Sequence, residues 1–177
     1  LKISGKLEKA ETIFRHVIIL DPEFHQAFNN LGNTLLTLGK LEDAKTVLIK
    51  LLKFKSNYSE AYLNLGITHY RLGNFTDAEM NLRQAINFKP NFVQAHNNLG
   101  LILKEVGKLS EAEASFRKAF SLDPQLTSAR NNLGVTLKDL GKLQQAEALF
   151  RELISINSER PEFHNNLGLT FYDLGKF

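Results

Sequence analysis

A four-residue motif, Asn-Asn-Leu-Gly or its variant Leu-Asn-Leu-Gly, occurs five times in this chain of 177 residues. Each copy follows the previous one by 34 residues, with no insertion. The copies end at Gly32, Gly66, Gly100, Gly134 and Gly168. A fixed period of this length is typical of a solenoid, in which small units stack in a row. It argues against a single globular core.

Each repeat contains two helical patterns separated by a glycine. Apolar residues recur at helical spacing from Leu7 to Leu20, from His25 to Leu38 and from Leu41 to about Phe54. Pro22 ends the first of these helices, because proline cannot continue a helix. We expect the turn within each repeat at a glycine that takes the left-handed conformation. These turn glycines are Gly5, Gly39, Gly73, Gly107, Gly141 and Gly175.

Small residues recur where two helices must approach closely. A glycine inside a helix costs about 1 kcal/mol relative to alanine. The five motif glycines therefore predict that a side chain or backbone packs directly against each of them. The second helix of each repeat carries an alanine column and, four residues later, a large apolar column. The columns are Ala10, Ala44, Ala78, Ala112 and Ala146, and Phe14, Leu48, Leu82, Phe116 and Phe150.

These features together resemble the tetratricopeptide repeat (TPR) family. The resemblance covers essentially the whole chain and implies an all-α fold, a right-handed superhelical solenoid of antiparallel helix pairs. We expect one array over 1–177, with Pro161 in the first turn of its last helix. The array divides into a partial repeat 1–24, full repeats 25–58, 59–92, 93–126 and 127–160, and a partial repeat 161–177.

The resemblance also implies that the first helix of each repeat lines a concave face. One asparagine per repeat occupies that face, and three residues later comes a mostly apolar position. An asparagine amide donates and accepts hydrogen bonds, so it can pair with the backbone of an extended peptide whatever the peptide's side chains. We call Asn30, Asn64, Asn98, Asn132 and Asn166 the ladder. The second groove column is Asn33, Ile67, Leu101, Val135 and Leu169, and a third is Gln26, Glu60, Gln94, Ser128 and Glu162.

The ladder predicts contact with roughly a dozen residues of extended peptide, at about 3.3 Å per ligand residue and about 8–10 Å between repeats. It resembles the asparagine ladder in the TPR superhelix of O-linked N-acetylglucosamine transferase. The alternative is that these asparagines hydrogen-bond within the array. Neighbouring asparagines at Asn29, Asn97, Asn131 and Asn165 make the signal less specific.

Other classes of function find little support. A net charge of +3 is too weak to indicate nucleic acid, and no apolar run approaches the roughly 18 residues of a membrane span. No nucleophile–base motif or phosphate-binding loop is present, and we expect no cofactor and no metal. His69 falls in a core column and is expected to be packed. With no cysteine and no targeting signal the sequence does not indicate a compartment, and the cytoplasm is the default.

Two charged patterns follow the same period. Glutamate and arginine four residues apart on the second helices predict surface ion pairs, for example Glu113–Arg117. A lysine row at the turns, at Lys6, Lys40, Lys108, Lys142 and Lys176, suits the negative end of the helix dipole. Its alternative function is to hold an acidic partner.

We therefore predict a non-catalytic scaffold that binds extended peptides. The alternatives are the substrate-recruiting arm of a larger enzyme, such as a glycosyltransferase, and, with less support, a helical-repeat RNA binder. The chain begins and ends within a repeat, so we expect it to be a piece of a longer protein. Its two end helices would be complementary halves of one repeat, which predicts head-to-tail association between chains.

Overall fold

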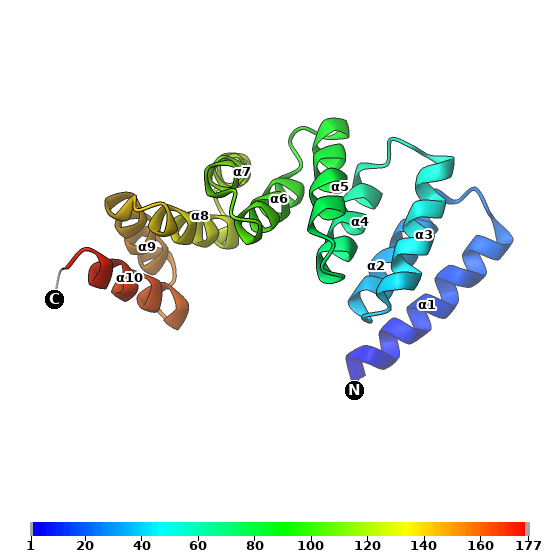
Figure 1. Ribbon diagram of the computed structural model, residues 1–177. Helices are drawn as coiled ribbons and strands as arrows, with labels where there is room; N and C mark the ends of the chain where they lie inside the picture. Colours follow the sequence, from blue (N-terminus) through cyan, green and yellow to red (C-terminus); the bar gives the residue numbers. More distant parts are fainter. Residues whose placement is uncertain (1, 176–177) are drawn as a thin grey trace. The chain divides into compact units, whose positions relative to one another are not determined.

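The computed structural model describes residues 2–175, and within them all regular structure is helical (Figure 1). The apolar spacing of the sequence accounts for these helices, since each buries one apolar stripe. The ten helices are α1 (Lys2–Leu20), α2 (His25–Thr37), α3 (Leu41–Phe54), α4 (Ser59–Arg71), α5 (Phe75–Phe88), α6 (Val93–Glu105), α7 (Leu109–Leu122), α8 (Thr127–Asp139), α9 (Leu143–Ile156) and α10 (Pro161–Asp173).

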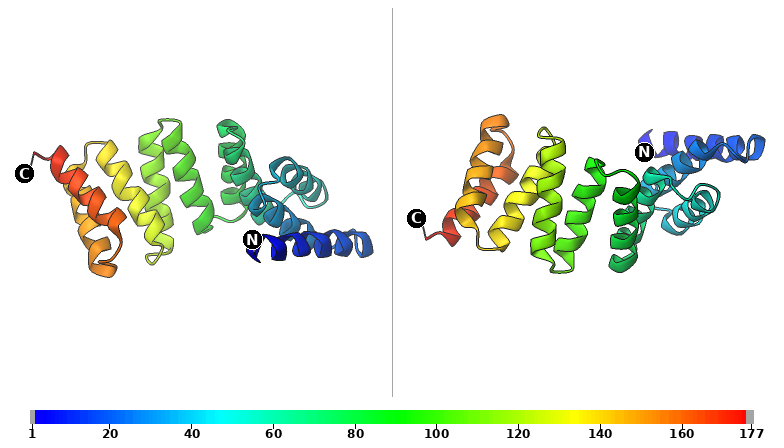
Figure 2. Two further views of the ribbon diagram at one scale, coloured as in Figure 1. Left: turned by 90° about the horizontal axis from the view of Figure 1, so that it is seen from below. Right: turned by 90° about the horizontal axis from the view of Figure 1, so that it is seen from above.

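The chain consists of two units, Leu1–Pro90 and Asn91–Phe177, and each is described by itself. The first unit holds α1 to α5 and the second holds α6 to α10. Within the second unit, α7 packs on α8, α8 on α9 and α9 on α10, as both views of Figure 2 show. We call α2, α4, α6, α8 and α10 the first helices and the others the second helices. The prediction of one array over 1–177 stays a prediction.

A glycine with positive φ ends each first helix, as the sequence predicts. Gly39 has a φ of 78° and donates its N–H to the carbonyl of Leu36 at 3.1 Å. The next residue, Lys40, donates to the carbonyl of Leu35 at 2.9 Å. This pair of bonds is a Schellman motif, which satisfies the last carbonyls of the helix. The same φ region recurs at Gly73, Gly107, Gly141 and Gly175.

The expected turn at Gly5 is wrong. Gly5 lies inside α1, which begins at Lys2 and not at Leu7. No residue with positive φ occurs before Gly39 in the described part of the chain. The physical reason is that no described helix precedes Gly5 for a turn to connect, so the helical hydrogen bonds continue through it.

Four of the five motif glycines are contact points, as predicted. A Cβ atom added to Gly32 would lie 2.6 Å from Leu48, and one added to Gly100 would lie 2.6 Å from the ring of Phe116. Gly66 and Gly134 are equally crowded, by Leu82 and Phe150. The prediction is wrong for Gly168, because nothing in the described part of the chain lies within 4 Å of its added Cβ.

The core of each unit consists of the large apolar columns and the alanine column. Phe116 and Phe150 are fully buried, as are Leu48 and Leu82 in the first unit. The four alanines from Ala44 to Ala146 are also fully buried. Leu48, Leu82, Phe116 and Phe150 each pack into the notch of a motif glycine, which is the space left by its missing side chain on the paired first helix. These glycines therefore set how closely the two helices approach.

Candidate functional site

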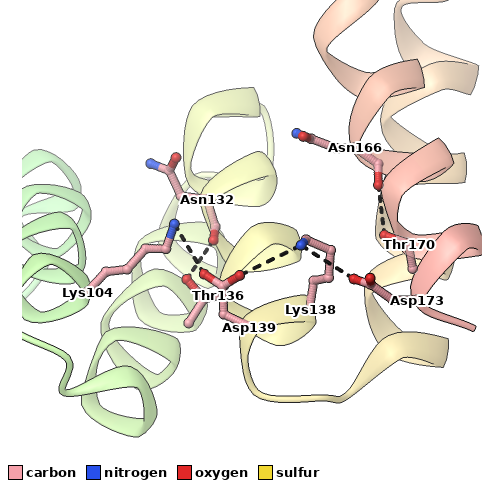
Figure 3. A network of polar contacts seen from close by, with 8 residues as sticks. All are labelled: Lys104, Asn132, Thr136, Lys138, Asp139, Asn166, Thr170 and Asp173. Atoms are coloured by element: carbon pink, nitrogen blue, oxygen red, sulfur yellow. Dashed lines mark hydrogen bonds and ion pairs between the residues drawn. The ribbon is translucent and has the colours of Figure 1, made fainter.

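The ladder asparagines lie on the five first helices, and all five are half-buried. Figure 3 shows the amide groups of Asn132 and Asn166 projecting from α8 and α10. Their main-chain carbonyls accept the hydroxyls of Thr136 and Thr170, both at 2.8 Å. The backbone carbonyls of these two residues are thus already hydrogen-bonded, and their amide groups project away from the helices.

Most ladder amides hydrogen-bond to the preceding repeat. Nδ2 of Asn64 donates to Oδ1 of Asn29 at 3.0 Å, and Nδ2 of Asn166 donates to Oδ1 of Asn131 at 3.0 Å. Asn132 donates to Asn97 in the same way at 3.3 Å. The asparagine directly before a ladder position thus accepts a hydrogen bond from the ladder asparagine of the following repeat. This is the bonding within the array that the alternative interpretation expects.

These bonds use one of the two amide N–H groups of each asparagine. Among the described residues, none donates a hydrogen bond to Oδ1 of Asn64, Asn132 or Asn166. One N–H and the carbonyl oxygen of each amide therefore stay available to a ligand. The bond to the preceding repeat fixes the direction in which they point.

Two rungs of the ladder differ from the others. Asn98 donates its Nδ2 to the carbonyl of Gln94 in its own helix at 2.8 Å. Asn30 makes no side-chain hydrogen bond to any described residue, although its main-chain carbonyl accepts Thr34 at 2.8 Å. In the repeat of Asn98, Ile102 occupies the position that corresponds to Thr34. The main-chain carbonyl of Asn98 therefore has no threonine hydroxyl beneath it.

The threonine column was not singled out in the sequence. Each of these threonines donates its hydroxyl to the carbonyl of the ladder residue four positions earlier, at 2.7–2.8 Å. They are buried, with Thr68, Thr136 and Thr170 at 0% exposure. Their 34-residue period, broken only at Ile102, was the available signal. The column comprises Thr34, Thr68, Thr136 and Thr170.

The second groove column is uneven. Asn33 is exposed, while Ile67, Leu101 and Val135 are half-buried. Ile67 also packs against the core cluster of Leu31 and Leu35, so part of its side chain serves the fold. Leu169 is 46% exposed and offers the largest apolar surface of the column.

A polar cavity of about 120 Å³ lies beside the ladder in the second unit. It lies between α8 and α10 and is lined by Ser128, Asn131, Asn132 and Glu162, with Arg160 at its edge. Asn131 holds the carboxylate of Glu162 by donating Nδ2 to Oε1 at 2.7 Å. The cavity brings ladder and third-column residues together in one place.

The other carboxylate of the third column is paired. Oε1 of Glu60 lies 3.0 Å from Nζ of Lys89, and Ser59 donates its hydroxyl to Oε2 at 2.9 Å. Burial raises the pKa of Glu60, but the hydrogen bonds from Lys89 and its neighbours outweigh it and hold the pKa below 4.5. Glu60 is therefore a charged group in this column at neutral pH.

A chain of ion pairs joins the ends of the first helices in the second unit (Figure 3). Nζ of Lys104 lies 3.3 Å from Asp139, and Nζ of Lys138 lies 3.5 Å from Asp173. Lys138 also lies 3.9 Å from Asp139. Each lysine contacts the aspartate of the following repeat. This column was not predicted, although Lys104 and Lys138, and Asp139 and Asp173, are each one period apart.

The predicted ion pairs on the second helices are present. Glu11 pairs with Arg15, and Glu113 with Arg117, both at 2.9 Å. The other two pairs are Glu79–Arg83 and Glu147–Arg151.

Two lysines of the predicted row take part in the same clusters. Lys40 lies 2.8 Å from Glu11, and Lys142 lies 2.7 Å from Glu113. These two lysines therefore bridge successive repeats and are not left for an acidic partner. Lys176 lies outside the described residues.

His69 is packed, with its side chain only 11% exposed. Its Nδ1 is buried without a hydrogen bond to a described residue and lies 3.7 Å from Asp77. Burial lowers the pKa of His69 below 6.5, and Asp77 only partly opposes this. Within the described residues, no group of three histidine, cysteine or acidic residues could hold a metal ion. None of the described helices has the length and apolarity to cross a bilayer.

Tetratricopeptide repeat models match five segments that together cover residues 13–88 and 93–159. The chain belongs to the tetratricopeptide repeat family. One match, to residues 93–126, has the same bounds as one repeat expected from the motif spacing. Another covers 126–159 and 59–88. No curated protein matches the chain in sequence.

Solved TPR structures share this fold. The chain is similar to YrrB, described as a TPR protein with an unusual peptide-binding site, with a TM-score of 0.81 and 21% identity. That match covers 92% of this chain and 84% of YrrB. MamA matches with a TM-score of 0.77 and 23% identity over 87% of this chain and 90% of its own. TTC0263, a TPR protein of Thermus thermophilus, matches with a TM-score of 0.74 and 22% identity, over 95% and 92%. At these identities the comparison establishes the fold alone.

Proposed function

We propose that this TPR protein is a non-catalytic scaffold whose ladder asparagines bind the backbone of an extended peptide. The observation that carries the proposal is the orientation of the ladder amides. Asn64, Asn132 and Asn166 are each held by the preceding repeat, and each keeps an amide oxygen and one N–H for a ligand. A fixed amide loses little entropy when it binds, which favours association.

The strength of such binding is limited. A net hydrogen bond is worth about 0.5–1.5 kcal/mol, so the ladder contributes a few kcal/mol at most before the peptide is ordered. Weak binding that tolerates many sequences follows from this estimate. Selectivity would come from the neighbouring positions, such as Leu101, Val135 and the cavity beside Glu162.

The similarity to YrrB supports the general role, since that protein is described as having a peptide-binding site. TPR proteins generally act as scaffolds for protein interactions. If the chain is the recruiting arm of a larger enzyme, the ladder would do the same work of holding a peptide for an attached catalytic domain. The sequence of the full gene distinguishes the two.

The proposal is tested with a 12-residue peptide selected for binding to this chain from a random library. Substituting Asn64, Asn98 and Asn132 together by alanine should weaken its binding at least about tenfold, because several hydrogen bonds are lost at once. The control carries alanine at Asn57, Asn87 and Asn91, three exposed asparagines outside the first helices. Unchanged affinity in the ladder variant, with both proteins folded by circular dichroism, would contradict the proposal.

A second proposal concerns self-association of the 177-residue chain. Gly168 on α10 has an empty notch, whereas the four other motif glycines are filled by the column of Leu48, Leu82, Phe116 and Phe150. Phe14 on α1 belongs to that same column and is only half-buried. We propose that α1 of one chain packs against α10 of another and that Phe14 fills this notch.

A further inference from the structure

A second cavity lies in the first unit, between α1, α2 and α3, and has a volume of about 300 Å³. Its walls are apolar and consist of Ile18 and Ile19 of α1, Phe28 and Leu31 of α2, and Val47 of α3. Ile19 is 74% exposed, so the apolar surface continues out of the cavity. A volume of this size is at the lower end for ligand pockets and suits one or two side chains.

Two cations stand at the rim of this cavity. Nζ of Lys50 lies 5.5 Å from the ring centroid of Phe28, and no carboxylate among the described residues pairs with it. Arg15 completes the rim and is held by Glu11 at 2.9 Å. An apolar cavity with an uncompensated lysine at its edge is complementary to an apolar group that carries a negative charge beside it.

The corresponding place three repeats further along the chain has different charges. There Arg130 takes the position of Phe28, Phe120 that of Ile18, and Glu152 that of Lys50. The guanidinium of Arg130 lies 4.6 Å from the ring centroid of Phe120 and 3.7 Å from the carboxylate of Glu152. Arg130 is only 9% exposed, so its side chain fills the space between α7 and α9.

The second unit therefore shows how the chain itself can pair the charge at this place. A long side chain lies against the aromatic ring, and its charge meets an opposite charge on the following second helix. In the first unit the buried ring of Phe28 stands where Arg130 stands in the second, and it brings no charge, while Lys50 has the opposite sign to Glu152. Lys50 therefore has no opposite charge beside it, and a ligand that complements this place is an apolar group joined to an anion.

We propose that the cavity between α1, α2 and α3 is a second docking site of this protein, which takes an acidic peptide segment through one large apolar side chain. The apolar side chain enters between Ile18, Phe28 and Val47, and a flanking carboxylate pairs with Lys50. Phe54, which is 59% exposed and whose ring lies 6.1 Å from that of Phe28, extends the surface for the next residue of the segment. This site is distinct from the ladder, since no ladder asparagine lines the cavity.

The probe is a fluorescein-labelled hexapeptide with Leu-Phe at its centre and two glutamates on each side. One control peptide has lysines in place of the glutamates, and another has Ser-Ser in place of Leu-Phe. Fluorescence anisotropy with the whole chain should show binding of the first peptide alone. Raising the salt concentration should weaken it, because the rim contact is exposed.

Two variants identify the site. Lys50→Glu introduces the glutamate that Glu152 supplies at the same repeat position, and it should weaken binding about five- to tenfold. Ile19→Ser should weaken binding about as much. The matched control is Lys118→Glu, the same charge change at the same repeat position on α7, and it should leave the affinity unchanged. The ladder variant at Asn64, Asn98 and Asn132 should also bind the probe as the unchanged protein does.

Several results would overturn the proposal. Equal binding of the lysine peptide, or an equal loss in Lys118→Glu or in the ladder variant, would show that the cavity does not recognise the probe. No binding of the probe, with Ile19→Ser instead lowering self-association or the binding of anionic lipid vesicles, would assign the surface to a second copy or to a membrane. In ¹³C-methyl spectra, Ile18, Ile19 and Val47 should shift on titration, and unmoved signals would count equally against it.

Discussion

Each ladder asparagine that contacts the preceding repeat uses one N–H for the array and keeps its amide oxygen and second N–H unbonded to the described residues. The sequence was sufficient to predict the ladder column, because its period is unbroken. It did not predict the role of Asn29, Asn97 and Asn131 as acceptors. That contact depends on the distance between neighbouring first helices, which cannot be read from the repeat period of the sequence.

The motif glycines allow a matched comparison at the residue scale. Gly100→Ala places a Cβ within 2.6 Å of the buried Phe116 ring, which cannot move aside easily, so we expect the free energy of unfolding to fall by about 1–2 kcal/mol. Gly168→Ala meets nothing within 4 Å and should raise the same free energy by up to about 1 kcal/mol through helix propensity. Urea denaturation of both variants measures the difference. An equal loss in both would contradict the packing role.

His69 predicts a pH dependence of stability. Burial disfavours its charged form, and its neighbours Asp77, Lys45 and Glu42 do not reverse this, so its folded pKa lies below 6.5. The unfolded chain then binds the proton more tightly, and the contribution of His69, fully present above about pH 6.5, is lost as the pH falls through the folded pKa.

His69→Leu introduces the leucine that Leu35 and Leu103 supply at this position in other repeats, and it should remove that loss below about pH 6.5. It should also stabilise the protein by about 1 kcal/mol at neutral pH, because the unpaired Nδ1 is gone. Thermal unfolding across this pH range provides the test. A variant with the same pH slope as the unchanged protein would contradict the explanation.

At the scale of helices, apolar spacing and turn glycines were enough to predict most bounds. The expected helix from Leu41 to Phe54 has those bounds, and Pro161 begins α10. Gly5 was misassigned because its position in the period matches the other turn glycines, while a turn also needs a helix on each side. The cavity between α1, α2 and α3 was not predicted, since it depends on which side chain fills the space.

Glu113 links α7 to the start of α9. It is 8% exposed and contacts Arg117 of its own helix and Lys142, the residue just before α9. Burial raises its pKa, but the two cations outweigh this and hold the pKa below 4.5. Glu113→Gln should lower the free energy of unfolding by about 1–2 kcal/mol at neutral pH.

The stabilising effect of Glu113 is present above about pH 4.5 and is lost as the pH falls through the folded pKa. The difference between the variant and the unchanged protein should therefore shrink in acid. Glu105→Gln, an exposed change on α6, is the control and should have little effect at any pH. A Glu113→Gln difference that does not shrink as the pH falls below about 4.5 would contradict the assignment.

At the scale of the whole molecule, the proposed head-to-tail contact predicts a concentration-dependent mass. Sedimentation velocity on the 177-residue chain should show association, and Gly168→Leu, which fills the open notch, should reduce it. Tyr172→Leu, an exposed change on the same helix, should leave it unchanged. A single monomeric species at millimolar concentration would refute the contact.

The repeat period was enough to predict the fold class. A single repeat cannot bury its own apolar columns, so the repeats must stack on one another to bury them. The partner is less accessible to sequence, since backbone recognition leaves no trace of the ligand's side chains in the ladder.

Backbone recognition by the ladder is the central claim, and methylation of the ligand tests it most directly. The selected 12-residue peptide is compared with versions that carry an N-methyl group at successive backbone amides. We predict that methylation at about every third residue lowers the affinity severalfold, whereas replacing the side chain at the same position changes it little. Equal affinity of the methylated peptides, with strong dependence on side chains, would contradict the account.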